Sequence, residues 1–300
     1  MAAAQPTLGF IGLGTMGEPM CRNLATKSGA KVLAFDVRQE PVNSLKRDGV
    51  ATGAASIAEV AETAEIVFLS LPGGNELAEV VAGEDGLLAR GRAGQIVVDH
   101  TTAPVALARE LEAALAEKSI TFLDAPVART RTAAIEGTLA VMVGGDAEAF
   151  ARVRPYLEHM GANVTHCGAS GNGQTAKLLN NMVLIQIVTA LADALAIGRR
   201  AGLDGELLFK VMSDGSADSF ALRHHGMLSM VKGEFPEHMF STYYALKDLT
   251  YALELAREYR VEANQAKQAE RLLRRTIDEG LGDAYFPVVY EIVDDRGGVD

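Results

Sequence analysis

The sequence is poor in cysteine and lacks any excess of positive charge. Only Cys21 and Cys167 occur among 300 residues. Neither belongs to a close-spaced pair, which excludes a disulfide framework or cysteine-based metal site and favours a reducing compartment. Acidic residues outnumber basic ones by 39 to 28, for a formal net charge of -11. This balance argues against nucleic acid or an anionic membrane surface as the partner.

Long apolar runs are also missing. Residues 1–7 lack the charged and apolar regions of a secretory signal, and apolar stretches such as residues 182–187 are far shorter than a membrane span. We therefore expect a soluble, cytoplasmic protein that binds no membrane. The 6 histidines show no metal-ligand spacing, so we expect no bound metal.

What is present is ample material for folded cores. Apolar residues make up 48% of the chain and charged residues 22%, and 300 residues are more than one ordinary core uses. The first part alternates β-rich runs with alanine-rich helical segments. Predicted strands cover residues 8–12, 31–36, 66–71, 96–99, 121–124 and 139–144, and predicted helices cover 16–27, 41–48, 57–62 and 105–117. Strict alternation is typical of βαβ units and a mostly parallel, doubly wound sheet.

The pattern changes after Gly168. A long helix is predicted over residues 174–201, with further helices over 205–212, 242–258 and 264–279 and no convincing strand. The glycine-rich residues 168–173 join the two parts. The predicted fold is thus an α/β Rossmann-like dinucleotide-binding domain over residues 1–168, followed by an all-α domain over residues 169–300 that starts with a long interdomain helix.

The strongest local motif is Gly12-Leu-Gly14-Thr15-Met16-Gly17, which follows the first predicted strand and opens the first helix. In such a motif the first glycine makes a tight turn, the second lets backbone amides approach a pyrophosphate, and the third lets helix pack on strand. A second strand ends at Asp36, where a carboxylate would accept the ribose hydroxyls of a dinucleotide. The motif therefore predicts a dinucleotide site.

Asp36 bears on the choice of cofactor. Its carboxylate would repel a 2′-phosphate, which favours NAD, with NADP as the alternative because Arg38 could reach such a phosphate or simply face solvent. Later strand ends should line the same cleft, which makes Leu71, Pro72 and Thr102 candidate cofactor contacts; ordinary turn chemistry would explain the same residues equally well.

A second chemical motif opens the long helix. Lys177 and Asn181 lie four positions apart and share a helix face, with Asn180 beside them. A lysine near a helix N-terminus gains nothing from the helix dipole, which suggests a chemical task. Beside an oxidised nicotinamide its ammonium form is disfavoured, so it could exchange a proton with a substrate hydroxyl. The alternative is a solvated lysine between the domains.

Together these segments resemble the β-hydroxyacid dehydrogenases, the family of 3-hydroxyisobutyrate dehydrogenase and several semialdehyde reductases. The resemblance covers nearly the whole chain and rests on the stretch around residues 9–24, Asp124-Ala-Pro-Val127 with Gly137-Thr-Leu and Met142-Val-Gly-Gly145, residues 171–181, and Leu246-Lys247-Asp248-Leu249. It implies a nicotinamide-dependent dehydrogenase or reductase acting on a CH–OH group, an active site between the two domains, and a homodimer or homotetramer.

The resemblance also implies roles for individual residues. Lys177 matches the catalytic general acid and base, and Asn181 matches a substrate-positioning asparagine, beside which we count Asn180 as a candidate. Lys247 matches a lysine that reaches the cofactor and substrate. Leu71, Pro72 and Thr102 match cofactor contacts.

One segment departs from the family. Where most members have Ser-Gly-Gly after Asp-Ala-Pro-Val, this chain has Ala128-Arg129-Thr130, similar to the sulfolactaldehyde reductases. A guanidinium offers a planar fork of donors for carboxylate or sulfonate oxygens. We therefore expect Arg129 and Thr130 to bind the anionic end of a small substrate, unless Arg129 only bridges to an acidic neighbour. Arg131 could add charge or point to solvent.

Two other readings share this architecture. An imine reductase would replace the catalytic lysine, so Lys177 speaks against that activity. A nucleotide-binding relative without turnover would lose the lysine or add basic segments, and this acidic chain does neither. The residues leave open the reaction direction and the choice among a carboxylate, a sulfonate and a β-hydroxy amino acid.

Overall fold

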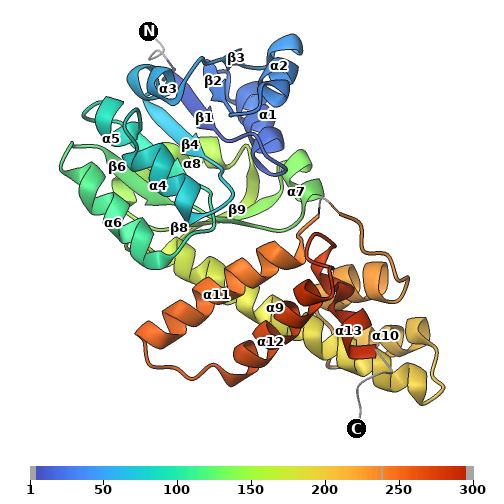
Figure 1. Ribbon diagram of the computed structural model, residues 1–300. Coiled ribbons are helices and arrows are strands. Elements are labelled where there is room, and N and C mark those ends of the chain that lie inside the picture. The colour runs from blue at the N-terminus through green and yellow to red at the C-terminus, as the bar shows by residue number, and fades with distance from the viewer. Residues whose placement is uncertain (1–4, 238, 295–300) are drawn as a thin grey trace. The chain divides into compact units, whose positions relative to one another are not determined.

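The computed structural model describes residues 5–237 and 239–294. It divides into two compact units, of which the first ends at Lys177 and the second begins at Leu178 (Figure 1). This division lies inside helix α9 (Asn172–Arg200) rather than at Gly168. The first turn of α9 is bonded into the first unit through the side chain of Gln174, which explains why the unit extends past the glycine-rich segment.

The first unit is built on a parallel sheet of six strands in the order β3-β2-β1-β4-β5-β6. This is the order of a dinucleotide-binding doubly wound fold, and it confirms the predicted fold class. Its central strands are fully buried, as a sheet covered on both faces requires. The strands are β1 (Leu8–Ile11), β2 (Val32–Phe35), β3 (Thr52–Gly53), β4 (Ile66–Leu69), β5 (Ile96–Asp99) and β6 (Thr121–Asp124).

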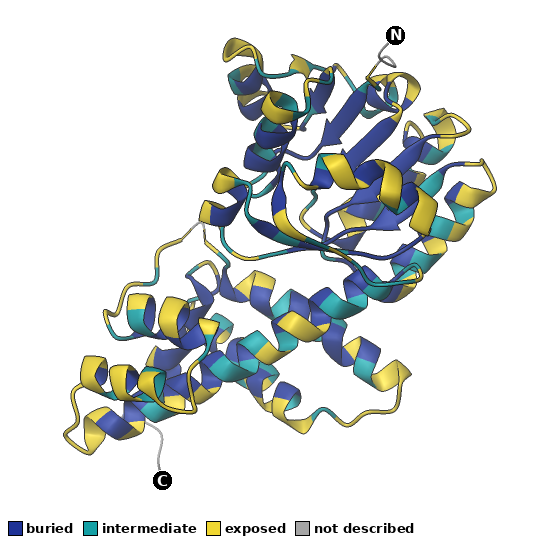
Figure 2. Cartoon of the chain, turned by 180° about the vertical axis from the view of Figure 1, so that it is seen from behind, coloured by how far each residue is buried: buried dark blue, intermediate teal, exposed yellow. Residues whose placement is uncertain are grey.

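Helices cover both faces of this sheet, because alternate strand residues point to opposite sides. Phe10 packs in a cluster with Met20 and Leu45, whereas Ile11 packs in a second cluster with Val60. Figure 2 shows the resulting pattern of buried strands and helices with exposed outer faces. The helices are α1 (Gly17–Ser28), α2 (Gln39–Arg47), α3 (Ile57–Thr63), α4 (Gly74–Ala82), α5 (Leu87–Arg90) and α6 (Val105–Ala116).

A smaller three-stranded sheet follows, in the order β7-β8-β9, with β7 antiparallel to β8. The predicted strand 139–144 is β8 and belongs to this second sheet, not to the parallel one. An isolated bridge between Asp124 and Gly144 joins the two. The strand β9 was not predicted because its residues are largely exposed and polar. These elements are β7 (Val127–Ala128), α7 (Arg131–Glu136), β8 (Leu139–Val143), α8 (Ala147–Leu157) and β9 (Gly161–His166).

The described residues of the second unit form helices joined by loops, with one isolated bridge between Ser241 and Tyr285. By length and composition α9 could cross a membrane, yet Ile185, Val188 and Leu195 on one of its faces pack into the core of this unit. It therefore fits the core helix of a folded domain. The other elements are α10 (Gly205–Asp214), a π-helix η1 (Leu222–Met230), α11 (Thr242–Glu258), α12 (Asn264–Asp278), the 3-10 turn η2 (Phe286–Val288) and α13 (Val289–Asp294).

Candidate active site

The turn between β1 and α1 has the geometry that the glycine motif predicts. Gly12 has a positive φ of 94°, and a Cβ there would lie 2.2 Å from the carbonyl oxygen of Ser70. A Cβ on Gly17 would lie 2.0 Å from the carbonyl oxygen of Gly12. Both positions therefore need glycine, one for the turn and the other for the close packing of helix on turn.

Gly14 differs because a Cβ there would meet no protein atom within 4 Å. Its freedom from side-chain contacts leaves room for a ligand against the backbone. The N-cap of α1, Met16, provides no side-chain cap; of the next residues, Glu18 donates its N–H to the carbonyl oxygen of Gly14 at 3.1 Å and Pro19 has no N–H. An open glycine beside an uncapped helix N-terminus suits the diphosphate of a dinucleotide. The residues present thus fit the predicted cofactor.

Asp36 lies directly after β2 and is only 6% exposed. Its carboxylate accepts hydrogen bonds from the backbone N–H groups of Leu13 (2.6 Å) and Arg38 (2.8 Å) and from Nε of Arg38 (3.2 Å). Burial alone would raise the pKa of Asp36, but these donors together lower it below its usual value. The carboxylate is therefore ionised, and it also fixes the glycine turn.

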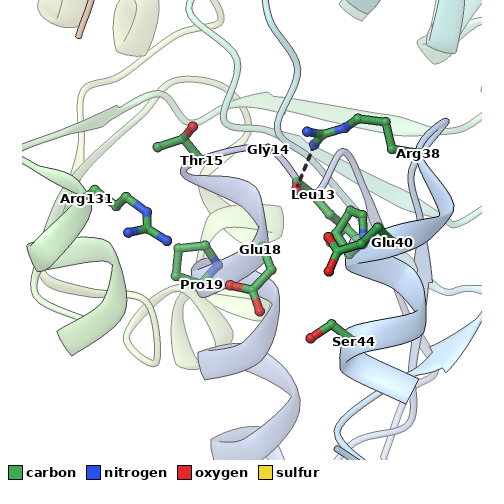
Figure 3. A pocket seen from close by; sticks show the side chains of 10 residues that line it. Leu13, Gly14, Thr15, Glu18, Pro19, Arg38, Glu40, Ser44 and Arg131 are labelled. Carbon is green, nitrogen blue, oxygen red and sulfur yellow. Dashed lines mark hydrogen bonds between the residues drawn. The ribbon is translucent and has the colours of Figure 1, made fainter. Parts of the chain in front are cut away.

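A shallow pocket of about 250 Å³ opens beside this turn. In Figure 3, Arg38 reaches toward it from one side and hydrogen-bonds the carbonyl oxygen of Leu13 at 3.2 Å, while Arg131 reaches from the first turn of α7 on the other side. The sequence left the direction of Arg131 open, and the structure places its side chain beside Gly14 and Thr15. The lining residues are Leu13, Gly14, Thr15, Glu18, Pro19, Arg38, Glu40, Pro41, Ser44 and Arg131.

The loops after β4 and β5 also lie at the carboxyl edge of the parallel sheet. Leu71 follows the end of β4 and donates its backbone N–H to the hydroxyl of Thr101 at 3.1 Å. Pro72 is exposed and Thr102 is half-buried. The structure thus brings the predicted residues of these two loops to one edge. It also shows that buried Thr101, which sequence reasoning passed over, is the residue that joins the loops.

Arg129 follows β7 and has a φ of 93°. Other non-glycine residues with positive φ, such as Ser119 and Arg260 at 58°, lie near the left-handed helical minimum, whereas Arg129 lies well beyond it. Its exposed guanidinium forms no hydrogen bond or ion pair with any described residue, so no acidic partner in this part of the chain accounts for it. Thr130 caps α7, accepting the N–H of Ala133 at 3.4 Å.

Lys177 lies in the second turn of α9 and is 9% exposed. One turn later, Asn181 donates its amide to the carboxylate of Asp248 at 2.6 Å, and the same carboxylate pairs with Lys247 at 3.1 Å. Asn180 is exposed and donates to the side-chain oxygen of Asn181 at 3.0 Å. The structure therefore gathers Asn181, Lys247 and Asp248, and it leaves Asn180 at their edge.

Sequence reasoning missed several buried polar residues beneath these loops. Gln174 is fully buried and bonds the loop after β5 through both ends of its amide. Asn23 donates to the carbonyl oxygens of Ala134 (2.8 Å) and Ile135 (3.1 Å), which ties α1 to the end of α7. Asn23 lies among apolar residues of its predicted helix, which was an available signal, whereas Gln174 lies in a glycine-rich, polar segment that gave no such signal. Within the described residues, no group of three or more His, Cys, Asp or Glu could hold a metal ion.

Comparison with known proteins agrees with this geometry. Residues 7–168 match the model of the NAD-binding domain of 6-phosphogluconate dehydrogenase, and residues 171–292 match that of the NAD-binding region of NADP-dependent 3-hydroxyisobutyrate dehydrogenase. An NAD-dependent L-serine dehydrogenase of Pseudomonas aeruginosa is 34% identical over 97% of this chain and 99% of its own length.

Two further relatives are both named 3-hydroxyisobutyrate dehydrogenase. A 3-hydroxyisobutyrate dehydrogenase of Pseudomonas aeruginosa is 43% identical over 72% of each chain. The structure of Mycobacterium tuberculosis 3-hydroxyisobutyrate dehydrogenase with L-serine superposes with a TM-score of 0.87 at 31% identity, covering 97% of this chain and 100% of that one. With its dinucleotide turn and sheet order, the chain belongs to the β-hydroxyacid dehydrogenase family and is an NAD(P)-dependent dehydrogenase acting on CH–OH groups.

Proposed function

We propose that this enzyme transfers a hydride between NAD and the alcohol or aldehyde carbon of a small acid whose anionic group is bound by Arg129. The substrate class is a 3-hydroxy acid or its semialdehyde, with a carboxylate or a sulfonate as the anion; sulfolactaldehyde is the sulfonate candidate. The names of the relatives support the size and chemistry, because 3-hydroxyisobutyrate and L-serine are both small acids with a hydroxyl on the β-carbon.

Lys177 is the proposed general acid and base. The bound cofactor supplies the site that accepts or donates the hydride. The Lys177 amine takes the hydroxyl proton when the alcohol is oxidised and returns it when the aldehyde is reduced. Negative charge therefore does not build up on the substrate oxygen without a proton donor beside it. The burial of Lys177 suits this task because it limits competing proton exchange with water. Asp248 orients Asn181 and Lys247, the proposed substrate-positioning pair.

The observation that carries the anion proposal is the backbone of Arg129. A non-glycine residue far into the positive-φ region is strained, and such strain concentrates at functional sites. Most members of the family that the whole chain resembles have glycine at this place, where a positive φ carries no strain. A strained arginine whose guanidinium engages no described residue is best explained by a ligand that needs the fork of donors.

Asp36 supports NAD over NADP. Its ionised, buried carboxylate holds three donors and would repel a 2′-phosphate. We propose that Arg131 contributes positive charge to the phosphates from the side of the pocket opposite Arg38. Titration of NADH and NADPH by cofactor fluorescence tests both points. Tighter NADPH binding would reject the role of Asp36, and an unchanged NADH Kd in Arg131→Ser would reject that of Arg131.

The decisive experiment is a substrate panel in which the alcohols are assayed with NAD+ and NADP+ in parallel and the aldehydes with NADH and NADPH. It contains 3-hydroxyisobutyrate, L-serine, succinic semialdehyde and sulfolactaldehyde, and the methyl ester of 3-hydroxyisobutyrate as the matched uncharged control. We expect turnover of at least one anion and a kcat/KM for the ester that is lower by roughly 10-fold or more, the value of a charged hydrogen bond. Equal kcat/KM for the acid and its ester would reject the anion site.

A further inference from the structure

The carboxylate of Asp124 holds the N-terminus of α9 from a distance in sequence. Asp124 is the last residue of β6 and is fully buried. One of its oxygens accepts the backbone N–H of Gly171 and the other accepts that of Gln174, each at 2.8 Å. These are donors at the start of a helix, which the helix itself cannot satisfy. Asp124 therefore caps α9 across 47 and 50 residues of sequence.

Two glycines of the family motifs make room for this carboxylate. A Cβ on Gly144 would lie 2.5 Å from Oδ1 of Asp124, and a Cβ on Gly173 would lie 2.8 Å from Oδ2. Gly144 also donates its N–H to the backbone oxygen of Asp124 at 2.7 Å. Neither glycine is among the residues proposed above to bind cofactor or substrate. Their place in the sequence is explained by the close approach of strand, loop and helix around one carboxylate.

The same turn of α9 is anchored a second time. The amide of Gln174 donates to the carbonyl oxygen of Thr101 at 2.6 Å and accepts the N–H of Ala103 at 3.2 Å. The turn is thus tied both to the end of β6 and to the loop after β5. Lys177 follows Gln174 by three residues and lies in the same compact unit. Its backbone position is consequently set by these two anchors.

Ordinary helix caps in this chain are different. Asp146 caps α8 and Asp204 caps α10, each accepting the N–H of the residue three positions later, and both are exposed. Asp124 gains its cap only by burial, which raises its pKa to about 6 despite the donors of Gly171 and Gln174. A helix that needed only a cap would take a local, solvated one. The buried arrangement instead fixes α9 against the segment that leads to Arg129.

We propose that Asp124 is a positioning residue of hydride transfer, which sets the Lys177 amine relative to the strand-end segment that carries Arg129. The inference rests on the proposed function, because it acts through the proton exchange of Lys177. Asp124 touches neither cofactor nor substrate in this proposal. It keeps the first turns of α9 in one place, and a misplaced amine would slow the chemical step without changing how cofactor binds.

The test compares Asp124→Asn with Asp146→Asn, the same change at an ordinary cap. Asparagine keeps one acceptor oxygen and turns an NH2 group toward the other backbone donor, so one anchor is lost. We expect Asp124→Asn to lower kcat by about 10- to 100-fold, with an unchanged Kd for NADH measured by fluorescence titration. We expect Asp146→Asn to keep the wild-type kcat. Equal kcat values for the two variants would overturn the proposal.

A second comparison separates this proposal from the role of Lys177. In the Lys177→Met background no amine remains to be misplaced, so adding Asp124→Asn should not slow the residual reaction further. An equal loss in both backgrounds would overturn the positioning role. Wild-type turnover of Lys177→Met alone would reject the proposed function instead. If Asp124→Asn does not fold, Gln174→Met removes the other anchor, and a wild-type kcat in that variant would also overturn the proposal.

Discussion

Arg129 offers the most informative perturbation, because its backbone strain and its charge can be removed separately. Arg129→Ala removes the guanidinium and keeps a Cβ at a φ of 93°. Arg129→Gly removes both. Positive φ costs an L-residue about 1–2 kcal/mol, while glycine loses roughly 0.5–1 kcal/mol through the greater freedom of the unfolded chain. The glycine variant should therefore exceed the alanine variant in free energy of unfolding by up to about 1.5 kcal/mol.

The two variants should lose activity alike. Both lack the fork of donors for the substrate anion, a loss worth about 1.5–3 kcal/mol, or roughly 10- to 150-fold in kcat/KM. Arg129→Lys keeps a positive charge without the planar fork of donors, so its kcat/KM should lie between those of the alanine and glycine variants and that of the wild type. Urea unfolding followed by circular dichroism gives the free energies of unfolding, and steady-state kinetics on the anionic substrate gives the kcat/KM values.

Two results would refute this reasoning. An alanine variant that is more stable than the glycine variant by about 0.5–1 kcal/mol, the entropic cost of glycine alone, would show that the backbone of Arg129 is not strained. A wild-type kcat/KM in both variants would remove the guanidinium from substrate binding. The uncharged ester serves as the internal control, because its kcat/KM should not depend on residue 129.

The remaining predictions concern the cofactor turn and a buried histidine. Gly14→Ala places a methyl group in space free of protein atoms, so it should raise the Kd for NADH and leave the free energy of unfolding unchanged. Gly17→Ala should lower the free energy of unfolding by about 1–3 kcal/mol, because its methyl group would overlap the backbone. A larger loss of stability in Gly14→Ala than in Gly17→Ala on urea unfolding, or an unchanged NADH Kd in Gly14→Ala, would contradict this. Burial, aided by His224, lowers the pKa of His225 from 6.5 to about 4. As the pH is lowered, the unfolded chain therefore binds this proton before the folded chain does. The free energy of unfolding should fall by up to roughly 3 kcal/mol between pH 6.5 and pH 4, and His225→Gln should remove this loss. A stability difference between the two proteins that does not change with pH would contradict this prediction.

The two-part architecture could be predicted because its signals are local. Strands such as Ile66–Leu69 are continuous apolar runs, and the glycine turn is read from spacing alone. The small sheet could not be predicted in the same way. Its strand Gly161–His166 has exposed polar residues, and Val127–Ala128 is too short to form a pattern. Their pairing depends on tertiary contacts rather than on propensity.

The candidate site likewise contains some residues that could be predicted from the sequence and others that could not. Residues proposed to contact the cofactor, such as Gly14 and Asp36, were identified from their position relative to the strands. The residues that hold them in place were not. Asp124 caps a helix that begins 48 residues later by number, and the partners of Gln174 lie in another loop, so neither role leaves a periodic trace in the sequence. Arg129 was singled out because it departs from the family's Ser-Gly-Gly, but its strained backbone became visible only in the structure.

The proposed hydride transfer depends most on the amine of Lys177, and replacement of this residue by methionine tests that group most directly. Methionine keeps the length and burial of the side chain and removes the proton-exchanging nitrogen. We predict that Lys177→Met lowers kcat/KM by about 100- to 10,000-fold, the usual worth of a general acid and base, while the Kd for NADH stays at the wild-type value. A variant that turns over the same substrate at the wild-type rate would contradict the account.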